Sequence, residues 1–186
     1  LRRGEHPRST LFPYTTLFRS DPFLPNKIDE GRHDEIRECI GCNMCISGDM
    51  TFTPIRCTQN PTIGEEYRKG WHPEIISPAA SKSSVLVLGG GPAGLEATLA
   101  LSNRGYNVTL AEASSELGGR VLLESRMPGL GEWKRVADYR TYLISQKSNV
   151  ETFVNSCLDA SEVLEFGFEH VLLATGSMWQ IGRAHV

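Results

Sequence analysis

The sequence predicts an α/β fold, and three observations support that class. Residues 85–88, Val-Leu-Val-Leu, form a short apolar run typical of a parallel strand buried on both faces. Directly after it stands Gly89-Gly-Gly91-Pro-Ala-Gly94, followed by a segment with helical spacing of small and apolar residues. A second apolar run, Asn107 to Ala111, ends at the acidic Glu112. Strand, glycines, helix and strand in this order predict a parallel βαβ unit.

The first predicted helix has clear start and stop signals. Pro92 suits the first turn, because its missing N–H would have no helical partner there. An alanine stripe with leucines beside it runs as far as about Arg104. Gly105 then ends the helix, since glycine readily adopts the left-handed conformation of a helix C-terminus.

The glycines match the G-x-G-x-x-G pattern of a Rossmann-like (FAD/NAD(P)-binding type) nucleotide-binding domain. Gly89 makes the turn, Gly91 lets the backbone approach a pyrophosphate, and Gly94 lets the helix close on the strand. The helix N-terminus presents free amides to the phosphates. Glu112 is expected to accept hydrogen bonds from an adenosine ribose and to disfavour a 2′-phosphate. The alternative is a glycine-rich turn that binds nothing.

Further along the chain, two more segments are expected to approach the same nucleotide. Leu117-Gly-Gly-Arg120 offers a second flexible loop, in which Arg120 pairs either with phosphate or with a surface carboxylate. Residues 133–146 predict a helix, 150–154 a strand, 160–166 a short helix and 171–174 another buried strand, which ends at Thr175-Gly176. The candidate nucleotide-binding set is Gly89, Gly91, Pro92, Ala93, Gly94, Glu112, Gly119, Arg120, Thr175 and Gly176.

Four of the five cysteines lie in one short stretch, at Cys39, Cys42, Cys45 and Cys57. Three at a repeat of three, with a fourth further on, are typical of ligands to a [4Fe-4S] cluster. A structural zinc site usually has two Cys-x-x-Cys pairs, and here the second pair is missing because Cys57 stands alone. Zinc stays an alternative, and disulfides are the weakest interpretation. Cys157, about a hundred residues away, is expected to be an ordinary buried thiol.

The regions around the cysteines have weaker signals. Residues 21–27 form a proline-rich lead-in without helical period, and 29–38 predict a short charged helix that ends where the cysteine loop begins. Residues 47–56 are expected to be a loop. Trp71 is expected either to cover a cluster or to pack in a loop, and His72 is expected to be structural. Residues 75–84 are rich in serine and predict a linker between two domains.

Composition excludes two classes of function. The formal net charge of −3 provides no general attraction to nucleic acid. No apolar run approaches the roughly 18 residues of a membrane-spanning helix. Clustered, reduced cysteines favour a cytoplasmic protein.

Both ends of the chain read like translated sequencing-library adapters. We therefore expect residues 1–20 and 180–186 to be artefactual additions, and the genuine protein to be an internal fragment. The alternative is a real basic N-terminal arm containing Arg2, Arg3 and Arg8.

The chain also resembles a known family. The resemblance lies in Asp21-Pro-Phe-Leu-Pro, Cys57-Thr-Gln-Asn60, Pro128-Gly-Leu-Gly-Glu-Trp133, Gly64-Glu-Glu-Tyr-Arg-Lys-Gly-Trp-His-Pro-Glu74 and Cys39-Ile-Gly-Cys-Asn-Met-Cys-Ile46. These segments are similar to the trimethylamine and dimethylamine dehydrogenases, which are iron–sulfur flavoproteins. Histamine dehydrogenase, the N-methylproline demethylases and the 2,4-dienoyl-CoA reductases are relatives. The reductases generally have an extra residue between the second and third cysteines, which this chain lacks.

The resemblance implies a domain organisation. Residues 21–74 would be the end of a barrel region and the [4Fe-4S] segment, 75–84 the linker, and 85–179 a truncated ADP- or FAD-binding domain. The TIM barrel that holds FMN and the substrate would be missing, and with it every catalytic residue. The fragment alone is then expected to be inactive.

The resemblance also implies a function for the full-length protein. It would be a homodimer that oxidatively demethylates a methylated amine at FMN and passes electrons through the cluster to an electron-transferring flavoprotein. An NADPH-dependent 2,4-dienoyl-CoA or enoate reductase that uses FAD stays an alternative. A third is a non-enzymatic electron-carrier or zinc-binding module.

Overall fold

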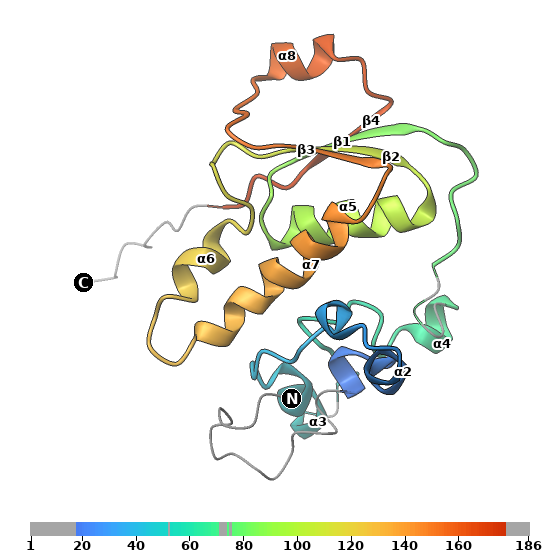
Figure 1. The fold of residues 1–186 in the computed structure, drawn as a ribbon, viewed down its shortest axis with the longest axis vertical. Helices are drawn as coiled ribbons and strands as arrows, with labels where there is room; N and C mark the ends of the chain where they lie inside the picture. The colour runs from blue at the N-terminus through green and yellow to red at the C-terminus, as the bar shows by residue number, and fades with distance from the viewer. Residues whose placement is uncertain (1–17, 52, 71–73, 75, 178–186) are drawn as a thin grey trace.

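The computed structural model describes residues 18–51, 53–70, 74 and 76–177. Its centre is a parallel sheet with the strand order β3-β2-β1-β4 (Figure 1). The strands are β1 (Ser84–Leu88), β2 (Asn107–Ala111), β3 (Val150–Phe153) and β4 (His170–Leu173). The sequence therefore predicted the α/β class and all of these strands correctly. Because β1 has β2 on one side and β4 on the other, its carboxyl end lies where the strand order reverses, which is where ligands bind in such sheets.

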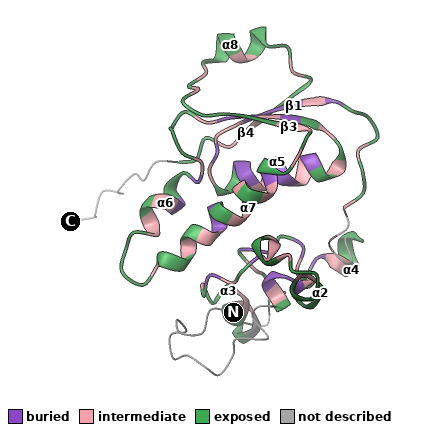
Figure 2. Cartoon of the chain, in the orientation of Figure 1, coloured by how far each residue is buried: buried purple, intermediate pink, exposed green. Residues whose placement is uncertain are grey.

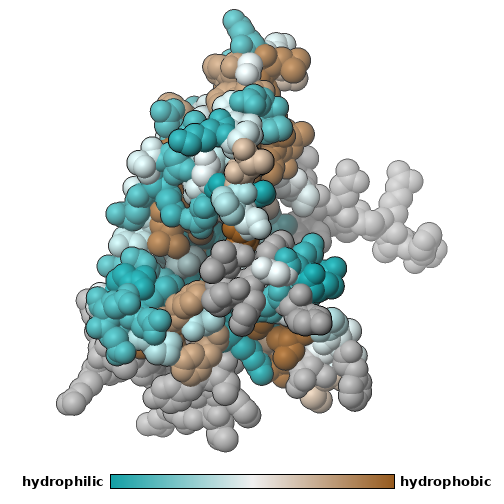
Figure 3. All heavy atoms as spheres, turned by 90° about the vertical axis from the view of Figure 1, so that its right-hand side faces the viewer, coloured by the Kyte–Doolittle hydropathy of each residue, from teal (hydrophilic) through white to brown (hydrophobic). Residues whose placement is uncertain are grey.

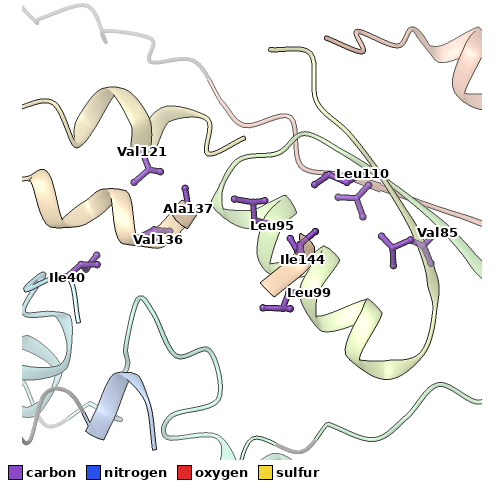
Figure 4. Close-up of a cluster of buried hydrophobic side chains, with 11 residues drawn as sticks. Ile40, Val85, Leu95, Leu99, Leu110, Val121, Val136, Ala137 and Ile144 are labelled. Carbon is purple, nitrogen blue, oxygen red and sulfur yellow. The ribbon is translucent and has the colours of Figure 1, made fainter. Parts of the chain in front are cut away.

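One face of the sheet carries the hydrophobic core. Helices α5 (Pro92–Arg104) and α7 (Arg135–Ser145) lie together on this face (Figure 1). Val87, Leu95 and Leu110 are fully buried there. Figure 4 shows Leu95 and Leu99 of α5 in one cluster with Ile144 of α7 and Leu110 of β2. The alternate residues of β1 and β2 supply this face because successive strand side chains point to opposite sides.

The helix signals read from the sequence are largely confirmed. Helix α5 begins at Pro92 and ends at Arg104, and Gly105 follows with φ +96°. The predicted helix 133–146 is a 3-10 turn, η2 (Gly131–Lys134), that continues into α7. Helix α8 (Ala160–Glu165) begins with a capping box between Asp159 and Glu162. A further short helix, α6 (Arg120–Glu124), was not predicted.

The prediction that the last strand is buried is wrong. Strand β4 pairs only with β1 among the described strands, and Leu172 alone packs against the core. Val171 and Leu173 are exposed on the opposite face, where Figure 2 shows green, exposed residues along β4 and α8. Figure 3 shows hydrophobic, brown atoms near the top of the molecule, the region of α8, to which exposed Leu164 and Phe166 belong. The apolar run was recognised correctly, but which of its faces is covered depends on the layers around it.

The prediction for residues 21–38 is also wrong in its boundaries. Helix α2 (Leu24–Asp29) occupies the expected lead-in, because Pro25 lies in the first turn where a proline is tolerated. The expected helix 29–38 is interrupted by Gly31 at φ +71°, and only the 3-10 turn η1 (His33–Glu35) forms. The buried carboxylate of Asp21 holds this region together. It accepts hydrogen bonds from the ammonium of Lys27 at 2.6 Å and from the backbone N–H of Arg37 at 2.8 Å.

Two further helices form in segments for which the sequence predicted no helix. Helix α3 (Met44–Met50) starts within the cysteine stretch, and α4 (Glu66–Lys69) is a single turn that ends at Gly70. Both are too short to show a hydrophobic period in the sequence. Cys157 is exposed, so the prediction of a buried thiol is wrong. Trp71, His72, residues 1–17 and residues 178–186 lie outside the described residues.

The cysteine segment packs against the sheet domain through α7. Ile40 belongs to the same hydrophobic cluster as Val136 and Ala137, and Figure 4 shows it beside Val136. The guanidinium of Arg135 donates a hydrogen bond to the carbonyl of Cys39 at 3.1 Å. The two parts of the chain therefore share one core. Among the described residues, no helix is both long and apolar enough to cross a membrane.

Candidate functional site

The glycine-rich loop turns at the carboxyl end of β1. Gly89 has φ +104°, a conformation that strongly favours glycine, and a Cβ added there would lie 2.4 Å from the carbonyl oxygen of Ala174. A Cβ added at Gly94 would lie 1.8 Å from the carbonyl oxygen of Gly89. The first glycine is therefore needed for the turn and the third for the contact between helix and strand, as the sequence predicted.

The middle glycine differs from the other two. Gly91 has an extended backbone, and among the described residues no atom beyond its chain neighbours lies within 4 Å of a Cβ added there. It precedes α5, and no side chain in the described part of the chain caps that helix. The first N–H groups of a helix have no helical partner, so these amides face an open space that a Cβ at Gly91 would partly fill. Such a space at a helix N-terminus suits a phosphate group, so the residues fit the predicted pyrophosphate.

The second glycine pair lies against the first. The N–H of Gly118 donates to the carbonyl of Gly90 at 2.8 Å, and a Cβ at Gly119 would lie 3.0 Å from the Cα of Gly91. Gly119 immediately precedes α6. The structure thus brings Gly119 next to the loop, as predicted.

Glu112 follows β2 and faces the same loop. Its Oε2 accepts the N–H of Gly90 at 2.5 Å, and its Oε1 accepts the N–H and the hydroxyl of Ser114, each at 2.7 Å. Burial acts to raise the pKa of this carboxyl, but the hydrogen bonds from Ser114, Gly90 and Ala113 outweigh it, so the pKa is lowered. The carboxylate is held charged beside the loop, where a ribose would lie.

The remaining predicted residues have mixed outcomes. The N–H of Ala174 donates to the carbonyl of Leu88 at 2.7 Å, so the chain passes beside Gly89 just before it reaches Thr175 and Gly176. Pro92 and Ala93 form the first turn of α5. The guanidinium of Arg120 pairs with Glu124 one turn further along α6, which is the surface ion pair foreseen as its alternative.

Sequence reasoning missed three residues of this site. Gly90 bonds to both Glu112 and Gly118, and Ala174 limits the space at Gly89. Ser114 orients the Glu112 carboxylate. The uninterrupted run of three glycines could have indicated Gly90, because a Cβ there would lie 2.6 Å from a Leu117 methyl. The roles of Ala174 and Ser114 have no local signal.

The four clustered cysteines are all free thiols and partly buried. Gly41 and Asn43, with φ of +68° and +58°, turn the chain between the first three of them. The N–H of Gly41 donates to the Sγ of Cys39 at 3.4 Å. The sulfur of Cys42 lies 2.9 Å from the hydroxyl oxygen of Thr58.

The thiols influence one another electrostatically. Burial raises the pKa of the Cys39 thiol, and the charges of Cys57, Cys42 and Cys45 raise it further, against the hydrogen bond from Gly41. Within the part of the chain that the structure describes, no group of three or more His, Cys, Asp or Glu side chains is arranged so that it could hold a metal ion. The loop therefore brings four soft sulfur donors into one region without arranging them around a single metal-ion position. A donor set of four thiols fits an iron–sulfur cluster, and the cluster stays a prediction.

Comparison with known proteins defines the class first. Residues 83–182 match the family model described as pyridine nucleotide-disulphide oxidoreductase. Together with the parallel sheet and the glycine-rich loop, this match identifies an α/β nucleotide-binding domain of an oxidoreductase family.

Individual relatives narrow this class. The chain is 46% identical over 166 residues to dimethylamine dehydrogenase from Hyphomicrobium sp. (strain x), covering 86% of this chain and 23% of that protein. It superposes on histamine dehydrogenase from Rhizobium sp. 4-9 with a TM-score of 0.86 and 62% identity, covering 89% of this chain and 26% of that one. For 6-hydroxypseudooxynicotine amine oxidase from Pseudomonas geniculata N1, the TM-score is 0.87 and the identity 52%, covering 91% and 26% of the two chains.

These relatives confirm the resemblance. The chain belongs to the pyridine nucleotide-disulphide oxidoreductase family by its family model, and its relatives match the trimethylamine and dimethylamine dehydrogenase family. It spans about a quarter of the length of the relatives that it matches.

Proposed function

We propose that this chain is the cluster- and nucleotide-binding part of an iron–sulfur flavoprotein amine dehydrogenase. The observation that carries the proposal is the packing of a four-cysteine loop directly onto a nucleotide-binding domain. Ile40 and the carbonyl of Cys39 contact α7, and α7 packs on α5, the helix that begins at the glycine-rich loop. The two proposed cofactor sites thus belong to one packed unit.

The nucleotide site is proposed to hold the ADP moiety of ADP or FAD. Gly91 and the first amides of α5 would face the pyrophosphate, and Gly119 would approach it from the other side. Glu112 would exchange its hydrogen bond from Gly90 or Ser114 for one from a ribose hydroxyl. Because the Glu112 carboxylate is charged, a 2′-phosphate would be repelled, which favours ADP or FAD over NADP.

The cysteine loop is proposed to hold one [4Fe-4S] cluster through Cys39, Cys42, Cys45 and Cys57. Such a cluster accepts and releases single electrons. The chain's own residues would supply the thiolates, the backbone N–H groups that point at sulfur, and the partial burial that limits solvent access. Zinc is less suited to this loop, because the second cysteine pair is absent.

The activity of the whole protein is proposed from its relatives. A dimethylamine dehydrogenase, a histamine dehydrogenase and an amine oxidase all match this chain, so the substrate class would be an amine. We propose that FMN and the amine bind in a barrel domain outside this chain, that an electron-transferring flavoprotein receives the electrons, and that the full-length protein is a homodimer.

The test uses the 186-residue chain reconstituted anaerobically with iron and sulfide, beside a Cys42→Ser variant. We expect about four irons and four acid-labile sulfides per chain, with brown absorbance, and a clear loss of iron in the variant. Zinc without sulfide, or a Cys42→Ser chain with a full complement, would refute the ligand assignment. Calorimetric titration with ADP and with FAD then tests the second site, and no binding of either would refute it.

A further inference from the structure

Gln59 is two residues beyond the fourth cysteine and is among the most buried side chains, at 1% exposure. Its backbone N–H donates to the Sγ of Cys57 at 3.4 Å. Its side-chain Nε2 donates to the carbonyl of Glu38 at 3.0 Å, immediately before Cys39. One residue therefore connects the two ends of the cysteine loop, which are otherwise separated by 18 positions along the chain.

Gln59 is in turn held by a buried guanidinium. Arg140 of α7 is 3% exposed, and it donates from Nη1 to the Gln59 side-chain oxygen at 2.9 Å and from Nη2 to the Gln59 carbonyl at 3.1 Å. Its Nε donates to Glu96 of α5 at 2.7 Å. A charge is costly to bury unless it is paired and hydrogen-bonded, so this guanidinium strongly restricts where Gln59 can lie.

We propose that Arg140 and Gln59 are positioning residues for the cluster ligand Cys57. Arg140 fixes Gln59 from both its backbone and its side chain. Gln59 then keeps the Cys57 sulfur near the Cys39 end of the loop and keeps an N–H directed at that sulfur. Hydrogen bonds to ligand sulfur and the residues behind the ligands tune the reduction potential and the affinity of such clusters. This inference rests on the cluster proposed above.

The sharpest variant is Arg140→Lys, which keeps the positive charge but removes the planar fork that contacts Gln59 at two points. In the reconstituted chain, we expect iron release to a chelator to become roughly tenfold faster or more, because residues behind metal ligands contribute about that much to affinity. We also expect the midpoint potential, followed by the electron paramagnetic resonance of the reduced cluster, to shift from the unsubstituted value.

The matched control is Arg37→Lys. Arg37 is also a buried arginine near the cysteines, but its guanidinium contacts the carbonyl of Ser20 and the carboxylate of Glu74. Arg37→Lys should lower the free energy of unfolding as Arg140→Lys does, but it should leave the midpoint potential of the cluster unchanged. Equal shifts in both variants would overturn the assignment to Arg140.

A second variant separates positioning from folding. Arg140→Met combined with Gln59→Leu replaces both partners by apolar side chains, so neither faces an unpaired polar side chain of the other. Glu96 also loses its hydrogen bond to Arg140, but its side chain is partly exposed, so water can replace that bond. We expect this double variant to fold and bind a cluster of altered potential and faster iron release. Unaltered potential and release would overturn the inference, as would an Arg140→Lys variant indistinguishable from the unsubstituted chain. Failure of the unsubstituted chain to take up iron would instead refute the proposed function.

Discussion

At the scale of single residues, the three glycines of the loop have three distinct roles that one motif does not distinguish. Gly89 and Gly94 are required by the fold, because a Cβ at either would overlap a backbone carbonyl oxygen. Gly91 faces open space and has a backbone that any residue can adopt. Only Gly91 can therefore be changed to test binding without also testing folding.

For this reason we expect Gly91→Val to fold with nearly unchanged stability. Its affinity for ADP and FAD should fall at least about a hundredfold, because a valine side chain in the space for the pyrophosphate would cost about 3 kcal/mol of binding free energy. Titration calorimetry and urea unfolding measure the two effects. Gly94→Ala is the matched control, which should fail to fold or be severely destabilised. Unchanged affinity in Gly91→Val would show that phosphate binds elsewhere.

Glu112 gives a prediction about pH. Its pKa is lowered in the folded state, so its stabilisation is fully present above the ordinary carboxyl value of 4.5 and is lost as pH falls through the lower folded-state value. Glu112→Gln should therefore lower the stability at pH 7, and the difference from the unsubstituted chain should shrink as the pH falls below 4.5. Urea unfolding at several pH values measures this, and a difference independent of pH would contradict it.

At the scale of elements, α5 serves both the binding loop and the core. It starts at the glycine-rich loop, contributes Leu95 and Leu99 to the core, and accepts a hydrogen bond from Arg140 of α7 at Glu96. The proposed phosphate site needs free amides at the N-terminus of α5, whereas the core needs close packing along its middle. The sequence signals for both ends of this helix were strong, because proline and glycine act locally.

Thr98 of this helix is expected to reduce the stability of the fold. It is fully buried, and its hydroxyl has no hydrogen-bond partner within the described residues. Thr98→Val removes the unpaired hydroxyl and keeps the shape, so we expect the free energy of unfolding to rise by about 1 kcal/mol. Thr62→Val is the control, because the hydroxyl of Thr62 donates to Asn60 at 2.8 Å, and its loss should destabilise by about the same amount. A destabilised Thr98→Val chain in urea unfolding would mean that the hydroxyl has a partner.

At the scale of the whole molecule, the chain joins a cysteine loop and a nucleotide-binding domain and spans about a quarter of the length of its relatives. The functional roles proposed for its described residues are to bind or position cofactors. Val171 and Leu173 of β4 and Leu164 and Phe166 around α8 are exposed on the outer side of the domain.

We therefore expect the chain alone to show no amine-dependent reduction of an artificial dye, even when it carries a cluster and a nucleotide. A reconstituted sample assayed with dimethylamine and with histamine measures this. Dithionite reduction of the cluster in the same sample is the control that the cluster is redox-active. Any turnover with either amine would show that a catalytic group lies within these 186 residues.

The sequence by itself determined the features that depend on neighbouring residues. These are the strand, glycine loop, helix and strand of residues 84–111, the acidic residue at 112, and the cysteine spacing, because each follows from local backbone geometry or from a short repeat. It misplaced the short helices around the cysteines, since helices of fewer than two turns, such as α2 and α4, are too short to show a hydrophobic period.

Only the tertiary structure decided which distant residues contact these features. It brought Gly118 to Gly90, Ala174 to Gly89, and Arg140 to Gln59, which is 81 positions away along the chain. It also left β4 and Cys157 exposed where the sequence predicted burial. Contacts and burial of this kind depend on how the layers pack. A residue's own neighbours in the chain do not specify which distant element will lie against it.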